Sequence, residues 1–188
     1  MKQLAVFASG TGTNFGAIAK AGAAGIIDAR VAVMVCDKPG APVIDRAREM
    51  GIETFVFAPK EFSGKAAYEA QIVKVLDEKK IDLVCLAGYM RIVGETLLQA
   101  YEGKIINIHP SLLPSFKGAH AVEDAVAYGV KVYGITIHWV NADLDGGKII
   151  AQRAFPYEGS DPNEVHRIGQ KIEHELYVET INKLLCAR

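Results

Sequence analysis

The stretch Leu83-Val-Cys-Leu-Ala87 decides the fold, together with Val31-Ala-Val-Met-Val35. Neither stretch alternates apolar and polar residues, so each predicts a strand that is buried on both faces in a parallel sheet. Further strand-like runs and stretches of helical period alternate around these two. The predicted strands are 4–8, 31–36, 53–57, 83–87, 104–108, 132–140 and 148–156, and the predicted helices are 14–24, 42–50, 65–79, 94–101, 121–128 and 161–185. This alternation predicts an α/β fold with a mostly parallel, Rossmann-like sheet and helices on both faces.

The C-terminal part of the chain departs from this regular alternation. Residues 141–147 are too few to hold a crossover helix, so strands 132–140 and 148–156 are expected to form an antiparallel hairpin. The helix at 121–128 is expected to bring strand 132–140 parallel to strand 104–108. The long final helix carries its apolar residues at helical spacing, which predicts one buried face.

Length and composition limit the class of protein. The chain has 188 residues, of which 50% are hydrophobic, and a formal net charge of −1, so one compact domain without nucleic-acid or membrane binding is expected. A strand-like run begins at Leu4, where a signal peptide would need a long apolar segment. The cysteines Cys36, Cys85 and Cys186 lie far apart and are expected to be reduced thiols in a cytoplasmic protein. The oligomeric state stays open, with a homodimer as one option.

A glycine-rich loop, Ser9-Gly-Thr-Gly-Thr-Asn14, follows the first predicted strand and has three interpretations. It is a dinucleotide site with Asp37 as the ribose-binding acid, a phosphate site for a mononucleotide-sized ligand, or a tight turn without a ligand. The dinucleotide motif G-x-G-x-x-G fails because Phe15 stands at its last position. We favour the phosphate site, because exposed N–H groups at a helix N-terminus attract anions. Thr13 or Asn14 is expected to cap the helix.

The most informative segment is Asn107-Ile-His-Pro-Ser-Leu-Leu-Pro114. Asn107 and His109 are two residues apart at a strand end, so they point to the same face. Asp145 precedes two glycines that permit a sharp turn toward them. This trio suits acyl transfer to an amine. Asn107 is expected to stabilise the oxyanion, His109 to act as general acid and base, and Asp145 to raise the pKa of His109.

Other interpretations of these residues compete with catalysis. A histidine at a strand end often only packs, and Asp-Gly-Gly often only forms a hairpin turn. Ser111 is a candidate nucleophile beside His109, although the G-x-S-x-G elbow is missing. No H-x-H or H-E-x-x-H pattern supports a metal site, so no metal is expected.

The three segments together resemble the folate-dependent formyltransferases. These are the loop Ser9–Asn14, the run Asn107–Pro114 and the run Asn141-Ala-Asp-Leu-Asp-Gly-Gly147. Within that family the chain is similar to members that act in purine biosynthesis. The resemblance implies transfer of a formyl group from the co-substrate 10-formyltetrahydrofolate to the amine of glycinamide ribonucleotide. The products would be formylglycinamide ribonucleotide and tetrahydrofolate.

The resemblance also implies roles for individual residues. Catalysis would fall to Asn107, His109 and Asp145, with Asn107 also contacting the folate. Substrate binding would fall to Gly12, Thr13, Asn14, Gln170 and Glu173, and folate binding to Lys65, Met90, Arg91, Ile92 and Val93. Lys65 stands where the family often has Arg. A lysine could pair with a glutamate carboxylate but lacks the two-pronged contact that an arginine makes. Residues 1–100 would form the substrate-phosphate-binding half, and residues 101–188 the catalytic and folate-binding half. His120 and His138 are expected to pack or to support other residues, and His174 has no expected role.

Other functions remain as alternatives. A formyltetrahydrofolate hydrolase would share the catalytic core but adds an N-terminal regulatory domain, for which a strand at Leu4 leaves no room. Methionyl-tRNA formyltransferase adds a tRNA-binding domain and a basic surface. A nucleotide-binding oxidoreductase would use the glycine loop for NAD(P), and a catalytically dead module would bind folate without turnover.

Overall fold

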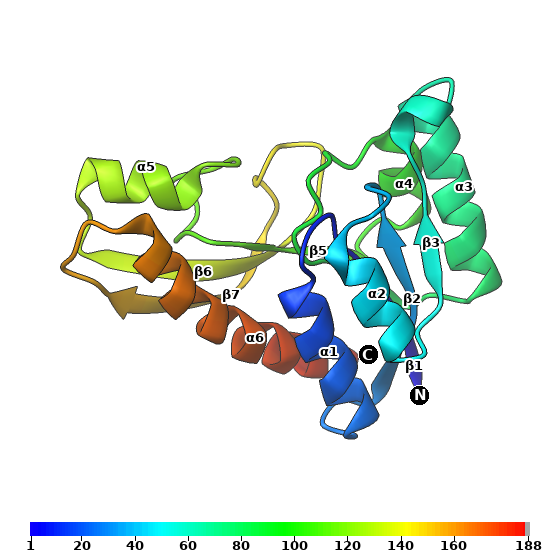
Figure 1. Cartoon of the computed structure of the whole chain (residues 1–188), viewed down its shortest axis with the longest axis horizontal. Coiled ribbons are helices and arrows are strands. Elements are labelled where there is room, and N and C mark those ends of the chain that lie inside the picture. Colours follow the sequence, from blue (N-terminus) through cyan, green and yellow to red (C-terminus); the bar gives the residue numbers. More distant parts are fainter. Residues whose placement is uncertain (187–188) are drawn as a thin grey trace.

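The computed structural model describes residues 1–186 and shows one mixed sheet with helices on both faces (Figure 1). The strands of this sheet lie in the order β3-β2-β1-β4-β5-β6-β7. The strands are β1 (Lys2–Phe7), β2 (Ala29–Cys36), β3 (Thr54–Val56), β4 (Leu83–Leu86), β5 (Ile105–His109), β6 (Val132–Trp139) and β7 (Ile149–Pro156). The α-helices are α1 (Thr13–Ala23), α2 (Pro42–Glu49), α3 (Lys65–Glu78), α4 (Glu95–Ala100), α5 (Ala121–Tyr128) and α6 (Pro162–Cys186). The predicted fold class is confirmed, and a short 3₁₀ helix at Pro59–Glu61 was not predicted.

The apolar side chains form a layer on each face of the sheet. The layer under α1, α2 and α6 includes Phe15, Val43 and Tyr177, and the layer under α3 and α4 includes Ile72 and Leu97. Central strands therefore have no solvated face, which explains the continuous apolar runs in β2 and β4. None of the helices within residues 1–186 combines the length and apolar composition that a membrane span requires.

The first five strands run parallel, and their pairing aligns the ends that carry the predicted site. Phe7 of β1 lies beside Leu86 of β4, and Leu86 lies beside Asn107 of β5. Adjacent strands are about 4.8 Å apart, so the loops after β1 and β4 begin within about 10 Å of Asn107. Ligands of such sheets bind at this carboxyl edge.

The predicted direction of β6 is wrong. β6 pairs antiparallel with β5, with Ile106 opposite Trp139 and His109 opposite Thr136, and its first residues extend past the end of β5 to pair with β7 alone. A parallel β6 would require the chain to return to the amino edge of the sheet. The α5 helix instead lies beside this overhang of β6 and β7 (Figure 1), so the chain never makes that return. The predicted antiparallel hairpin of β6 and β7 is confirmed.

Candidate functional site

Asn107 and His109 project from the same face of β5, as the period of a strand requires. His109 is 4% exposed. Its Nε2 lies 2.8 Å from the carbonyl oxygen of Phe116, and a carbonyl oxygen only accepts, so Nε2 carries a proton. Phe116 has a left-handed backbone (φ +53°), which is uncommon for an aromatic residue and directs this carbonyl toward the ring.

Asp145 reaches His109 although β6 runs in the direction opposite to the predicted one. Its Oδ2 lies 3.5 Å from Nδ1 of His109 and accepts the backbone N–H of Gly118 at 2.8 Å. The loop after β6 folds back along that strand. A Cβ on Gly147 would lie 1.7 Å from the carbonyl oxygen of Trp139, so the fold-back requires glycine there.

His138, which the sequence suggests packs or supports other residues, contacts two members of the trio. It lies opposite Asn107 in the sheet, its Nε2 is 3.2 Å from the Asn107 amide nitrogen, and it is 3.6 Å from Oδ1 of Asp145. Contact with His138, the N–H of Gly118 and the charge of His109 lower the pKa of Asp145 to about 2, against the opposing effect of burial. Only an antiparallel β6 places His138 opposite Asn107, so the wrong strand direction concealed these particular contacts.

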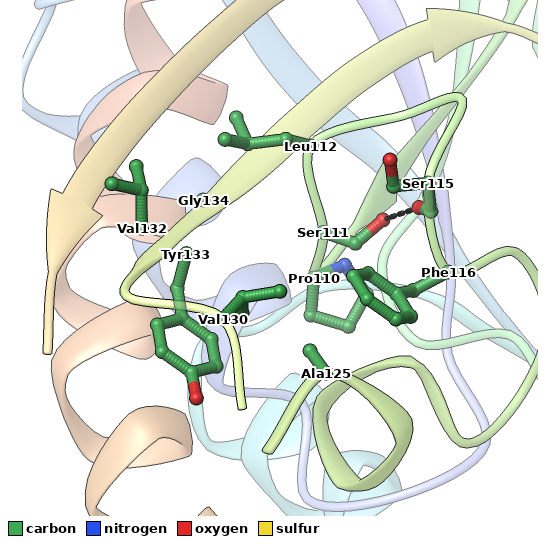
Figure 2. Close-up of a pocket in the computed structure, with 10 residues that line it drawn as sticks. All are labelled: Pro110, Ser111, Leu112, Ser115, Phe116, Ala125, Val130, Val132, Tyr133 and Gly134. Carbon is green, nitrogen blue, oxygen red and sulfur yellow. Dashed lines mark hydrogen bonds between the residues drawn. The ribbon is translucent and has the colours of Figure 1, made fainter. Parts of the chain in front are cut away.

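The loop that follows His109 is held by hydrogen bonds of its own (Figure 2). The hydroxyl of Ser111 donates to the carbonyl oxygen of Ser115 at 2.6 Å, and the hydroxyl of Thr136 on β6 donates to the carbonyl oxygen of Ser111. The Ser111 hydroxyl therefore donates its hydrogen bond to a backbone carbonyl and not to His109, which argues against a nucleophilic Ser111–His109 pair. The cavity beneath this loop measures about 120 Å³ and none of the trio lines it. Pockets for drug-sized ligands occupy about 300–1,000 Å³, so this cavity is too small for a ligand of that size.

The glycine loop and the final helix converge, as the resemblance implies. The amide nitrogen of Asn14 donates to Glu173 at 2.8 Å, and the amide of Gln170 donates to the hydroxyl of Thr13 at 3.2 Å. Asn14 is 8% exposed, and its buried Oδ1 has no hydrogen-bond partner among residues 1–186. A buried polar atom without a partner is costly, so it indicates a place where a ligand donates a hydrogen bond.

Gly12, rather than Thr13 or Asn14, is the N-cap of α1, and no side chain of the described residues caps the helix there. Gly12 has φ +70°, and a Cβ would lie 2.3 Å from Cγ2 of Val43. The loop therefore approaches α2 closely, and the first N–H groups of α1 have no partner within the helix. A helix end of this kind attracts an anion.

Asp37 does not have the free carboxylate of a ribose-binding acid. Its side chain is 7% exposed, accepts a hydrogen bond from the Ser9 hydroxyl, and lies 2.7 Å from Nε of Arg91. This observation argues against the dinucleotide interpretation of the glycine loop.

Apart from Asn107 on β5, the predicted folate-binding residues lie in the β4–α4 loop (residues 87–94) and on α3. Met90 is 74% exposed and Ile92 is 61% exposed, whereas Val93 belongs to the core. Leu144 in the β6–β7 loop is also exposed. Nζ of Lys65 on α3 donates to the carbonyl oxygen of Ile92 at 3.1 Å. Exposed apolar side chains on two loops around Asn107 fit a flat aromatic ligand such as a pterin.

The remaining histidines lie apart from the trio. His166 pairs with Glu123 across α6 and α5, and His120 is the N-cap residue of α5 without a capping side-chain bond. Nε2 of His174 is buried without a hydrogen-bond partner among the described residues. In that part of the chain no group of three or more His, Cys, Asp or Glu side chains is arranged to hold a metal ion.

Comparison with known proteins gives one family. The family model described as formyl transferase matches residues 2–181. Phosphoribosylglycinamide formyltransferase of Bacillus subtilis is 50% identical over 186 residues, which are 98% of this chain and 95% of the relative. The human trifunctional purine biosynthetic protein adenosine-3 is 38% identical over 93% of this chain and 17% of its own length.

Solved structures agree with the family model. Glycinamide ribonucleotide transformylase 1 from Geobacillus kaustophilus has a TM-score of 0.95 at 50% identity, covering 98% of this chain and 99% of that structure. Phosphoribosylglycinamide formyltransferase from Bacillus halodurans has a TM-score of 0.94 at 50% identity, covering 98% and 95%. The chain therefore belongs to the formyl transferase family.

Proposed function

We propose that the protein transfers the formyl group of 10-formyltetrahydrofolate to the amine of glycinamide ribonucleotide, in purine biosynthesis. The observation that carries this proposal is the convergence of three strand ends. The glycine loop after β1, the exposed apolar loop after β4 and the trio on β5 and after β6 meet at one edge of the sheet. Family membership and the names of relatives at 50% identity support the same reaction.

The phosphate of glycinamide ribonucleotide would bind at the N-terminus of α1. The open N–H groups of Thr13 and Asn14 suit a phosphate, which only accepts hydrogen bonds. The unpartnered Oδ1 of Asn14 needs a donor and suits a ribose hydroxyl. Glu173 and Gln170 on α6 lie close enough to share that binding. The substrate site would thus draw on both the N-terminal half (1–100) and the C-terminal half (101–188).

The folate would bind between the β4–α4 loop and the β6–β7 loop. Met90, Ile92 and Leu144 expose apolar side chains that suit a pterin face. Lys65 lies at the start of α3 and contacts the β4–α4 loop at Ile92. Its ammonium group suits the glutamate carboxylate of the folate. The backbone of Arg91 and Val93, and the amide of Asn107, would complete the contacts.

The trio would act on the formyl carbon as it passes through a tetrahedral state. Attack by the substrate amine places negative charge on the formyl oxygen, and the Asn107 amide would donate a hydrogen bond to it. His109 would carry the proton that leaves the attacking amine and deliver one to the folate nitrogen that departs. Proton gain and loss then balance over one turnover.

Two acceptors face the ring of His109 and orient it, the carbonyl oxygen of Phe116 at Nε2 and the carboxylate of Asp145 at Nδ1. The Nδ1–Asp145 separation of 3.5 Å is long for a hydrogen bond. Nδ1 would therefore stay free to take the proton of the attacking amine and to pass one to the departing folate nitrogen.

A formyl-transfer assay with glycinamide ribonucleotide and 10-formyltetrahydrofolate tests the proposal. Wild-type protein should form formylglycinamide ribonucleotide, and His109→Ala should lose about 10²–10⁴-fold in kcat while still binding the folate. His166→Ala is the matched control, because His166 is half-exposed and, among the described residues, pairs with Glu123 alone. Near-full activity in His109→Ala would contradict the mechanism. Saturable NAD(P) binding without formyl transfer would favour the oxidoreductase alternative.

The cytoplasm is the expected location of this activity. The free cysteines Cys36, Cys85 and Cys186 suit a reducing compartment.

A further inference from the structure

Asp37, the residue after β2, places a carboxylate in the interior of the molecule and uses both of its oxygens. One oxygen accepts a hydrogen bond from the Ser9 hydroxyl, and the other lies 2.7 Å from Nε of Arg91. A buried charge is costly unless it is paired and hydrogen-bonded. Arg91 is 40% exposed, so only the carboxylate side of this pair is buried.

Both partners of Asp37 lead to the same loop. Arg91 belongs to the β4–α4 loop. The Ser9 hydroxyl also accepts a hydrogen bond at 2.9 Å from the backbone N–H of Met90, the residue before Arg91. The Ser9 hydroxyl thus links the Asp37 carboxylate to the loop through two hydrogen bonds. Hydrogen bonds in such a chain strengthen one another. The backbone N–H of Ser9 donates to the carbonyl oxygen of Gly88 at 3.0 Å, which ties the start of the loop as well.

The far end of the loop is held separately by α3. The carboxylate of Glu69 is 2% exposed and accepts the N–H groups of Gly94 at 2.6 Å and Leu97 at 3.3 Å. Lys65 binds the carbonyl oxygen of Ile92. The segment that exposes Met90 and Ile92 therefore lies between two anchors, and Asp37 supplies the first.

We propose that Asp37 is a positioning residue that holds the β4–α4 loop in the conformation that binds the folate co-substrate. This inference rests on the proposed function, because it assigns the folate to that loop. A ligand loop fixed before binding loses less conformational entropy when the ligand arrives. Asp37 contacts the glycine loop at its first residue, Ser9, and not at the Thr13 and Asn14 N–H groups assigned to the phosphate, so its main effect should fall on folate affinity.

Asp37→Asn tests the inference with little change of shape. Oδ1 can still accept the hydrogen bond from Ser9. The new amide nitrogen would face Nε of Arg91, and because both groups are donors, that hydrogen bond is lost. We expect the Kd for tetrahydrofolate to rise about tenfold, as for loss of a charge-assisted hydrogen bond. The KM for glycinamide ribonucleotide, and kcat at saturating folate, should stay within about twofold of wild type. Asp45→Asn is the control, since Asp45 is exposed and within residues 1–186 forms an ion pair with Arg48 alone, and should change neither value.

A second variant and a measurement without substrates complete the test. Arg91→Gln removes the same ion pair from its exposed side, and should reproduce the folate defect even if Asp37→Asn does not fold. Ser9→Ala should speed hydrogen exchange at the Met90 amide, because that amide loses its acceptor. Unchanged folate affinity in both charge variants, or an equal loss of affinity for both substrates, would overturn the inference. Absence of formyl transfer in wild-type protein would instead overturn the proposed function and leave the exchange result unaffected.

Discussion

Oδ2 of Asp145 lies 3.5 Å from Nδ1 of His109, and the same oxygen accepts the N–H of Gly118. Contact with His138 contributes most to holding the pKa of this carboxyl at about 2, so the group is ionised at neutral pH. Asp145 is thus a fixed negative charge beside the imidazole, held by a backbone turn and a second histidine. The first prediction concerns the role of that charge in catalysis.

Asp145→Asn should lower kcat by about 10²–10³-fold and leave folate affinity largely intact. Asp145 has a left-handed backbone (φ +47°), which Asn adopts as readily as Asp, so the variant removes the charge without straining the turn. Asp145→Ala should lose activity to the same extent and also destabilise the loop by about 1 kcal/mol. Steady-state kinetics and tetrahydrofolate binding measure the two effects. Full activity in Asp145→Asn would show that the carboxylate takes no part in the reaction.

The lowered pKa of Asp145 also predicts how stability depends on pH. The folded-state pKa of about 2 lies below the ordinary value of 3.8, so ionised Asp145 stabilises the fold above about pH 4. This contribution, about 2 kcal/mol, is lost as the pH falls through 2. Urea unfolding should therefore find Asp145→Asn less stable than wild type at about pH 7, with a difference that shrinks in acid. A difference that stayed constant with pH would contradict the assigned pKa.

Ser111→Ala separates the acid–base mechanism from a nucleophilic one. The Ser111 hydroxyl donates to the carbonyl oxygen of Ser115, so it is not the partner of His109. We expect formyl transfer within about tenfold of wild type, and a loss of about 1 kcal/mol in the free energy of unfolding from the unpaired carbonyl. A loss of activity as large as that of His109→Ala would instead favour a covalent intermediate on Ser111.

Much of the fold was predictable from local patterns. The apolar runs in β2 and β4 predict buried parallel strands because period and burial are local properties of the chain. The direction of β6 was not predictable in this way. It depends on where α5 packs, and the sequence of α5 allows either a crossover or an extension beyond the sheet.

The site was predictable where side chains carry distinctive chemistry at short spacing. Asn107 and His109 are close through strand geometry alone, and Asp145 carries its two following glycines as a signal. His138 depends on strand direction, the Phe116 contact depends on a backbone carbonyl, and the contacts of Asp37 depend on three separate loops. None of these has a sequence signal, because each arises from packing between distant segments.

Asn14→Ala should weaken binding of glycinamide ribonucleotide more than it slows the chemistry. The variant removes the amide that contacts Glu173 and the unpartnered Oδ1 that we assign to the ribose. Loss of one hydrogen bond to a ligand predicts a rise of about tenfold in KM, with little change in kcat or in folate affinity. Gln99→Ala is the control, because Gln99 is exposed on α4 and its side chain, within the described part of the chain, hydrogen-bonds to Glu95 alone. An unchanged KM in Asn14→Ala would place the nucleotide elsewhere.

Gly12→Ala and Gly10→Ala form a matched pair that tests the geometry of the glycine loop through stability. Gly12 has φ +70°, and an added Cβ would lie 2.3 Å from Cγ2 of Val43, whereas a Cβ at Gly10 would meet no atom within 4 Å. The backbone strain costs about 1–2 kcal/mol and the collision about 1–3 kcal/mol more, so Gly12→Ala should be strongly destabilised in chemical unfolding. Gly10→Ala should stay within about 0.5 kcal/mol of wild type. Adding Val43→Ala to Gly12→Ala should relieve only part of the collision, because Cβ of residue 43 would still lie 2.8 Å from the added Cβ, and should leave the backbone strain unchanged. Equal stability of the two glycine variants would mean that the loop does not approach α2 as described.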